Sequence, residues 1–141
     1  MSVVRIQKVT FKKMEAEWYN YHQTVKEIAV LREEIMNPYN EEVNENSGGS
    51  SSGSVSSPTE RIATRLTTNK QLKYLNEVAT AIEQVYNALP ENYKQLVRCR
   101  YWSKRKRQWE SIAHECNVSV RQAQRWRDEI VQATIEELGW R

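Results

Sequence analysis

The stretch WESIAHECNVSVRQAQRWRDEI, residues 109–130, has the residue pattern of two helices joined by a tight turn. Ala113 is a small residue that lets a second helix cross the first closely. Asn117 is the turn residue, because Asn is second only to Gly in tolerating left-handed backbone geometry. Ser119 stands where a cap accepts hydrogen bonds from the free amides of the second helix. These features predict a helix-turn-helix over residues 109–130.

Helical periodicity divides the side chains of this pair into an inward and an outward set. The inward set, which holds the helices at a fixed angle, includes the small and turn residues: Trp109, Ile112, Ala113, Cys116, Asn117, Val118, Ala123 and Trp126. The outward set comprises the cap and the exposed face of the second helix: Ser119, Val120, Arg121, Gln122, Gln124 and Arg125. Arg and Gln bond bidentately to guanine and adenine edges, and Val contacts a thymine methyl. We predict that this face reads bases in double-stranded DNA, and a merely solvated helix face is the alternative.

The net charge of +3 is unevenly spread along the chain. Residues 1–46 carry six Lys and Arg against eight Asp and Glu, whereas residues 89–141 carry eleven against seven. A local basic excess is the electrostatic signature of a polyanion partner. A basic run directly precedes the predicted helix pair: Lys104, Arg105, Lys106 and Arg107. We predict that this run contacts DNA phosphates, with a solvated charge run as the alternative.

The first 40 residues are predicted to form an amphipathic helix. Its apolar positions alternate in steps of three and four: Phe11, Met14, Trp18, Tyr21, Val25 and Ile28. The sequence NPY at residues 37–39 should end it, because proline lacks an amide donor. This helix packs on the chain's own helices, pairs with a second copy as a homodimer, or contacts RNA polymerase. Residues 41–57, rich in Gly and Ser, are predicted to be a flexible linker.

Residues 58–141 are predicted to form a helical DNA-binding domain, which makes the whole fold all-α. Ser57, Pro58 and Glu60 form a capping box that opens a short helix. A second box, with Thr68 as cap, should start a new helix that runs to about residue 89. Another helix should restart at Pro90, with its arginines at positions 98 and 100 available to the outside.

Composition limits the class of protein. A chain of 141 residues holds one ordinary domain, or a small domain with an appendage. No apolar run approaches the roughly 20 residues of a membrane span, and the N-terminus lacks a signal-peptide core. We therefore expect a soluble cytoplasmic protein that does not contact a membrane. Cys99 and Cys116 are too few for a disulfide framework and are predicted to be buried thiols.

The sequence offers no set of residues for catalysis. His22 and His114 are the two histidines, and neither belongs to a nucleophile–base arrangement with supporting spacing. His114 and Cys116 have no second pair that would complete a zinc site. The glycines at positions 48, 49 and 53 lack the Lys-Ser or Lys-Thr of a phosphate-binding loop. We expect no enzyme activity, no metal and no cofactor.

The segment LPENYKQLVRCRYW (residues 89–102), the basic insert and the helix pair together resemble region four of bacterial sigma factors, which reads the upstream promoter element. Four further blocks extend the resemblance along the chain: WYNYHQTVKEIAVLREEIMNPY, SGGSSSG, PTERIATRLTT and AIEQVYNALPE. With all blocks in order, the chain is similar to the RinA family of phage transcriptional activators. The departures are a more basic sequence at residues 98–100 and Asn117 in the turn.

The resemblance implies a sequence-specific activator of phage late genes for packaging and morphogenesis. It would act in the cytoplasm of the bacterial host, on double-stranded DNA upstream of a late operon, with host RNA polymerase or a second copy as further partners. The alternative is a DNA-packaging adaptor like the phage terminase small subunit, which a ring-sized native mass would favour. A module whose basic face binds an acidic protein is a third alternative.

Overall fold

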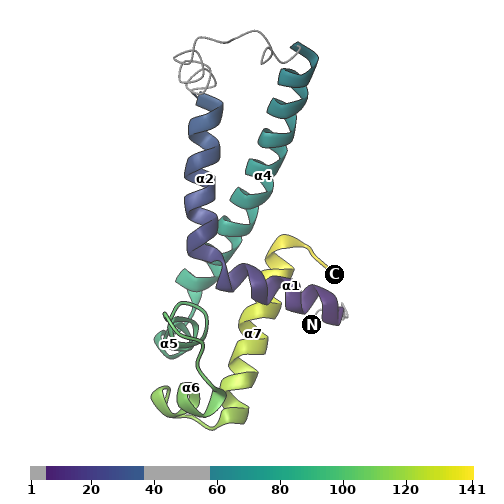
Figure 1. Ribbon diagram of the computed structural model, residues 1–141. Coiled ribbons are helices and arrows are strands. Elements are labelled where there is room, and N and C mark those ends of the chain that lie inside the picture. Colours follow the sequence, from purple (N-terminus) through teal and green to yellow (C-terminus); the bar gives the residue numbers. More distant parts are fainter. Residues whose placement is uncertain (1–5, 37–57) are drawn as a thin grey trace. The chain divides into compact units, whose positions relative to one another are not determined.

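The computed structural model describes residues 6–36 and 58–141, and the regular secondary structure of these two ranges is entirely α-helical (Figure 1). The helices are α1 (Lys8–Tyr19), α2 (Tyr21–Met36), α4 (Pro58–Ala88), α5 (Glu91–Arg100), α6 (Trp109–Glu115) and α7 (Val120–Leu138). The prediction of an all-α protein is confirmed. The predicted linker, the NPY helix stop and the cap residue Ser57 lie outside the described residues.

The chain divides into two compact units. The first comprises Met1–His22 together with Val78–Arg141, and the second comprises Gln23–Glu77. This division differs from the expected one, in which residues 1–40 and 58–141 were separate parts. The difference arises because α1 shares its apolar face with the C-terminal helices.

In the first unit, α7 packs against α1, α5 and α6. Figure 1 shows α6 beside the N-terminal half of α7 and α1 crossing its C-terminal half. All of these helices contribute side chains to one core, together with the end of α4. Its members include Met14, Trp18, Val78, Ile82, Leu96, Val97, Ile112, Ala123, Ile130, Val131 and Ile135.

Trp18 anchors α1 in this core. Its side chain is completely buried, and its Nε1–H donates to Thr134 Oγ1 of α7 over 3.1 Å. The Thr134 hydroxyl in turn donates to the carbonyl of Ile130 over 2.8 Å. A buried tryptophan removes roughly 150–250 Å² from water, and both polar groups that accompany it are hydrogen-bonded. Burial of Trp18 therefore makes α1 an integral part of the first unit.

The predicted single N-terminal helix is two helices. The backbone leaves helical geometry at Asn20, whose φ is −92° and ψ is 4°, and α2 begins at the next residue. The predicted apolar seam is interrupted beyond this break, since Val25 is 42% exposed although Ile28 is buried. Asn competes with helix formation through its short polar side chain, which favours a break at such a position.

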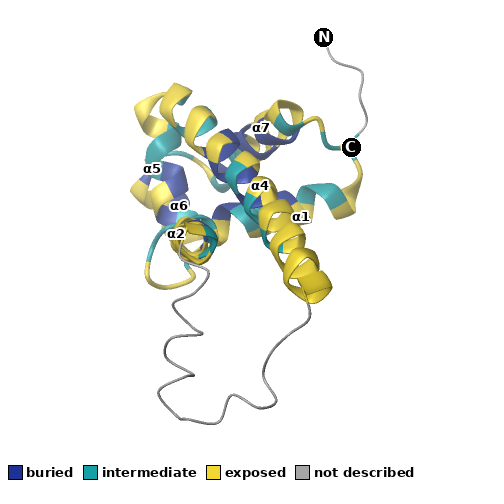
Figure 2. Ribbon diagram, turned by 90° about the horizontal axis from the view of Figure 1, so that it is seen from above, coloured by how far each residue is buried: buried dark blue, intermediate teal, exposed yellow. Residues whose placement is uncertain are grey.

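In the second unit, Thr24 and Ile28 of α2 and Leu75 of α4 are buried. Arg32 donates to Asn76 Oδ1 over 3.1 Å and joins the two helices. The predicted helix start at Thr68 is wrong, because α4 runs through it without a break. The N-terminal turns of α4 are exposed (Figure 2), including Ile62 and Leu66. Among the described residues, no helix is both long and apolar enough to cross a membrane.

Candidate nucleic-acid interface

The turn between α6 and α7 consists of residues 116–119. Asn117 has a φ of 57° and is the single non-glycine residue with positive φ in the described ranges. The amide of Val118 donates to the Ala113 carbonyl over 3.0 Å, and the amide of Asn117 donates to the His114 carbonyl over 3.1 Å. This pair of bonds is a Schellman motif, which closes a helix on a left-handed residue. The turn therefore ends α6 with satisfied carbonyls and a defined exit direction.

Ser119 is the N-cap of α7. Its Oγ accepts a hydrogen bond from the amide of Gln122 over 3.0 Å. Such a cap satisfies one of the free amides in the first turn of a helix. The start of α7 is thus fixed only two residues after the left-handed residue of the turn.

The residues expected on the inward side of the pair are buried or half-buried, except Asn117, which is exposed at the turn. Ile112, Ala113, Cys116, Ala123 and Trp126 are buried, and Trp109 and Val118 are half-buried. Trp126 stacks on Tyr93 of α5 with ring centroids 4.7 Å apart. The Tyr93 hydroxyl donates to Glu129 of α7 over 2.5 Å. These contacts hold α7 against α5 as well as α6.

The residues expected to read bases lie along the first turns of α7. Ser119, Arg121 and Arg125 are exposed, whereas Val120, Gln122 and Gln124 are half-buried. Arg121 and Arg125 are four residues apart, so they project from the same face of the helix. Further along α7 the exposed charges become acidic, at Asp128 and Glu129. The positive part of this helix is therefore its N-terminal part.

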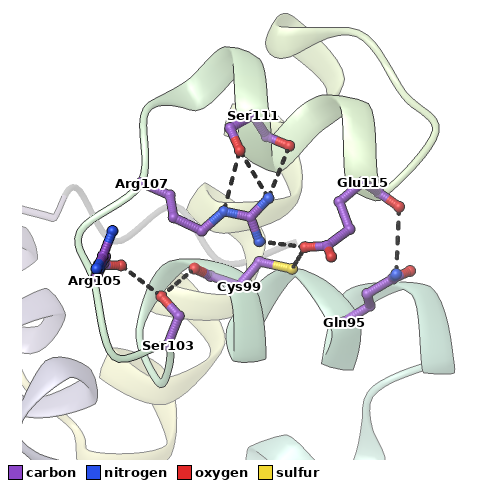
Figure 3. A network of polar contacts seen from close by, with 7 residues as sticks. All are labelled: Gln95, Cys99, Ser103, Arg105, Arg107, Ser111 and Glu115. Atoms are coloured by element: carbon purple, nitrogen blue, oxygen red, sulfur yellow. Dashed lines mark hydrogen bonds and ion pairs between the residues drawn. The ribbon is translucent and has the colours of Figure 1, made fainter.

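The segment between α5 and α6 presents three exposed cations, Lys104, Arg105 and Lys106, which we call the basic loop. Figure 3 shows how the residues around it tie it down. The Ser103 hydroxyl lies 2.9 Å from the Cys99 carbonyl oxygen and 2.7 Å from the Arg105 carbonyl oxygen. The loop is thus fastened to the end of α5.

Arg107 differs from the three cations before it. Its guanidinium pairs with the Glu115 carboxylate and donates to Ser111 Oγ over 2.8 Å, both on α6 (Figure 3). Glu115 also accepts a hydrogen bond from Cys99 Sγ over 2.7 Å. The sequence grouped Arg107 with the phosphate contacts. In the structure it fastens the second end of the loop to α6.

The same contacts perturb two acid groups. Hydrogen bonds from Cys99 and Arg107 lower the pKa of Glu115. Burial, with the neighbouring Glu115 carboxylate, raises the pKa of Cys99 to about 12. Cys99 is therefore a protonated thiol that donates to Glu115, and both cysteines are free and buried, as the sequence predicts.

Glu15 of α1 is a polar centre that the sequence did not reveal. Its Oε2 accepts from Tyr101 OH over 2.7 Å and from Arg100 over 3.0 Å, and lies 3.4 Å from the Arg127 guanidinium. Burial alone would raise the pKa of Glu15, but these hydrogen bonds and charges lower it. The sequence carries no signal for this cluster, because its members lie 85 or more residues away from Glu15.

Arg100 was expected on the outside, and this expectation is wrong. Its side chain is only 14% exposed, and the guanidinium carbon lies 4.2 Å from the ring centre of Trp109. Arg127 approaches the same ring at 5.1 Å. Arginine stacks well on aromatic rings and pairs well with partly buried carboxylates. The two arginines therefore link α1, α5, α6 and α7.

The ion pairs sort the basic residues between positions 100 and 127 into two groups. Three have carboxylate partners: Arg100, Arg107 and Arg127. Five make no ion pair with another residue of the described ranges: Lys104, Arg105, Lys106, Arg121 and Arg125. The unpaired positive charge thus belongs to the basic loop and the start of α7.

The fold and the site define a small all-α protein with a capped helix pair beside a pinned basic loop. By sequence, the chain belongs to the family described as "Protein of unknown function (DUF722)", whose model matches residues 10–136. It is 28% identical over 130 residues to "Transcriptional activator rinA" of Staphylococcus phage phi11, covering 92% of this chain and 91% of that protein. The chain is thus distantly homologous to a phage transcriptional activator. No solved structure matches it.

Proposed function

We propose that the protein is a sequence-specific, double-stranded DNA-binding transcriptional activator of phage late genes, without enzyme activity. The observation that carries the proposal is the sorting of charge. The three cations of the basic loop, and Arg121 and Arg125 of α7, form no ion pair among the described residues. The neighbouring Arg100, Arg107 and Arg127 are paired. Cations without a carboxylate partner in the protein are available to bind a polyanion. The distant homology to a phage activator supports the same function.

In this proposal α6 and α7 form a helix-turn-helix, and the start of α7 enters the major groove. Arg121 and Arg125 project from its exposed face, and Gln122 flanks them. Arg bonds to guanine O6 and N7, and Gln bonds to adenine N6 and N7. Arg105 and Lys106 of the basic loop supply contacts to the phosphate backbone, which fix register without reading sequence. Arg107 keeps that loop in place.

Residues 1–40 were predicted to contact a second copy or host RNA polymerase, and we propose that only part of this segment makes that contact. Met14 and Trp18 are buried in the first unit, so the apolar seam of α1 is already used within the chain. On α2, Val30 and Met36 are 58% and 78% exposed. We therefore assign this predicted contact to α2.

The groove assignment is tested by Arg121→Ala and Arg125→Ala. Each change removes one proposed base contact and should cost roughly 1–3 kcal/mol of binding free energy. It should also reduce discrimination between the late-operon upstream duplex and a scrambled duplex. Fluorescence anisotropy with both duplexes measures the two effects.

Gln132→Ala is the matched control, since Gln132 is exposed on the same helix two turns beyond Arg125. It should leave both affinities unchanged. Wild-type affinity and discrimination in both arginine variants would falsify the groove assignment. Footprinting with and without host polymerase then locates the operator and shows whether the two proteins bind together.

A further inference from the structure

A surface hollow of about 300 Å³ lies where α1, the end of α5 and the basic loop meet. It is lined by Tyr19, Arg100, Tyr101, Ser103, Arg105 and Lys106. These residues all belong to the first unit. The volume is at the lower end of the range for small-molecule sites, which suits one nucleotide-sized group.

The charge of this hollow comes from two residues. Arg100 forms part of the wall and pairs at 3.0 Å with Glu15, a carboxylate that it shares with Arg127. Arg105 and Lys106 are exposed and have no ion pair with another residue in the described part of the chain. The hollow therefore carries two unpaired positive charges, which suits an anion of one or two negative charges.

The walls are held in place before any ligand arrives. Tyr101 is 4% exposed, and its hydroxyl donates to Glu15 over 2.7 Å. The Tyr19 ring packs edge-on against the Tyr101 ring, with the ring centroids 4.7 Å apart. The Ser103 hydroxyl lies 2.7 Å from the Arg105 carbonyl oxygen and fixes the loop backbone. A site whose parts are already ordered loses less entropy on binding.

Tyr19 adds an uncharged donor to the hollow. Its side chain is 38% exposed, and its hydroxyl makes no hydrogen bond with any other residue that the structure describes. Two cations and a tyrosine hydroxyl are suitable donors for phosphate oxygens. The other exposed cation of the loop, Lys104, does not line the hollow.

We propose that this hollow binds a single phosphate ester, held by Arg105 and Lys106 with Tyr19 as a third donor, and that its source is one backbone phosphate of the bound duplex. This proposal takes its ligand, duplex DNA, from the proposed function, and it restricts the phosphate contact of the basic loop to one site. Lys104 takes no part in this contact, and α1 contributes a residue to the DNA-binding surface.

The test compares Arg105→Gln/Lys106→Gln with Lys104→Gln in the full-length protein. Duplex affinity is measured by anisotropy over a series of salt concentrations. Each neutralised phosphate contributes about 0.9 to the slope of log affinity against log salt concentration. The double variant should flatten the slope by about 0.9, the value for one shared phosphate. Lys104→Gln should keep the wild-type slope.

Tyr19→Phe separates the hydroxyl from the charges. Loss of one hydrogen bond to a charged group should weaken binding roughly tenfold with no change of slope. A flattening of about 1.8 in the double variant, as for two separate phosphates, would overturn the shared site. A flattening of the slope in Lys104→Gln equal to that in the double variant would also overturn the shared site.

A second arm uses a nucleoside monophosphate alone, with binding followed by tryptophan fluorescence. One outcome is that the wild type binds the monophosphate tightly and the double variant does not, while the two proteins show the same salt slope for the duplex. The hollow is then a phosphate-ester site, but a duplex phosphate is excluded as its ligand. If duplex binding responds to Arg121→Ala and not to the hollow variants, only the hollow proposal fails. If no duplex binds at all, the proposed function fails, and the monophosphate arm alone decides whether the hollow is a phosphate site.

Discussion

Asn117 occupies a backbone region that costs most L-residues free energy. Its φ of 57° brings the side chain close to the backbone, and only Gly avoids this repulsion. Asn is accepted because its short polar side chain bonds locally. The Schellman bonds at the end of α6 require this conformation, so the angle between α6 and α7 depends on one residue.

Asn117→Ala should therefore lower the free energy of unfolding by about 1 kcal/mol, because Ala lacks the local compensation that Asn has. Asn117→Gly should keep or slightly raise it, since Gly adopts positive φ without strain. Urea unfolding followed by circular dichroism measures both. Equal stability of the Ala and wild-type proteins would contradict a strained turn.

At the scale of elements, Glu15 joins α1 to α5 and α7 through one carboxylate. Arg100, Tyr101 and Arg127 all converge on its Oε2 atom. The side chains of Glu15, Arg100 and Arg127 are each less than one-fifth exposed, so water screens these contacts only in part. An uncompensated arginine here is costly, because its charge stays partly buried.

The Glu15 cluster predicts an acid dependence of stability. The pKa of Glu15 is lowered below 4.5 in the folded state, so the ionised carboxylate stabilises the fold above the unfolded-state pKa. This contribution is lost as the pH falls through the lowered folded-state pKa. Glu15→Gln should reduce the free energy of unfolding by about 2 kcal/mol at pH 7 and flatten its fall below pH 4.5.

Urea titrations at a series of pH values measure this effect. Glu137→Gln is the control, since Glu137 is exposed on α7 and makes no ion pair with another described residue. It should keep the wild-type pH dependence. An unchanged acid dependence in Glu15→Gln would show that other carboxylates cause it.

At the scale of the whole molecule, the first unit is built from both ends of the chain. A fragment of residues 58–141 lacks α1 and so loses Met14 and Trp18 from the core. Removing one buried Trp or Met typically costs about 2–5 kcal/mol, and a small domain has roughly 5–15 kcal/mol in total. The fragment should therefore unfold at a much lower urea concentration than the full chain, without a sharp transition.

Trp18→Ala in the full-length protein is the companion variant, with an expected loss of about 3–5 kcal/mol. Circular dichroism and amide exchange measure both proteins. A fragment with the midpoint and cooperativity of the full chain would instead support residues 58–141 as an independent domain.

Local signals in the sequence were sufficient for the all-α class and for the turn between α6 and α7. Asn117 and Ser119 act on backbone groups within five residues, and helical periodicity separates Trp126 from Arg125 along one short segment. Such interactions form between residues that are close in the chain, so they can be predicted from the local sequence. The continuity of α4 through Thr68 was missed because packing overrides weak local preferences. The break at Asn20 was missed because its local signal, the poor helix propensity of Asn, is weaker than the apolar periodicity around it.

The amino-acid sequence by itself determined an all-α protein with a capped helix pair next to a basic run, because caps, turns and periodicity act over a few residues. Tertiary structure decided which cations are unpaired and where α1 belongs. Arg107 and Arg100 look as available as Arg105 in the sequence, yet they form ion pairs with Glu115 and Glu15. Electrostatic and packing energies depend on distance in space, and only folding brings Glu15 to residues 85 positions away.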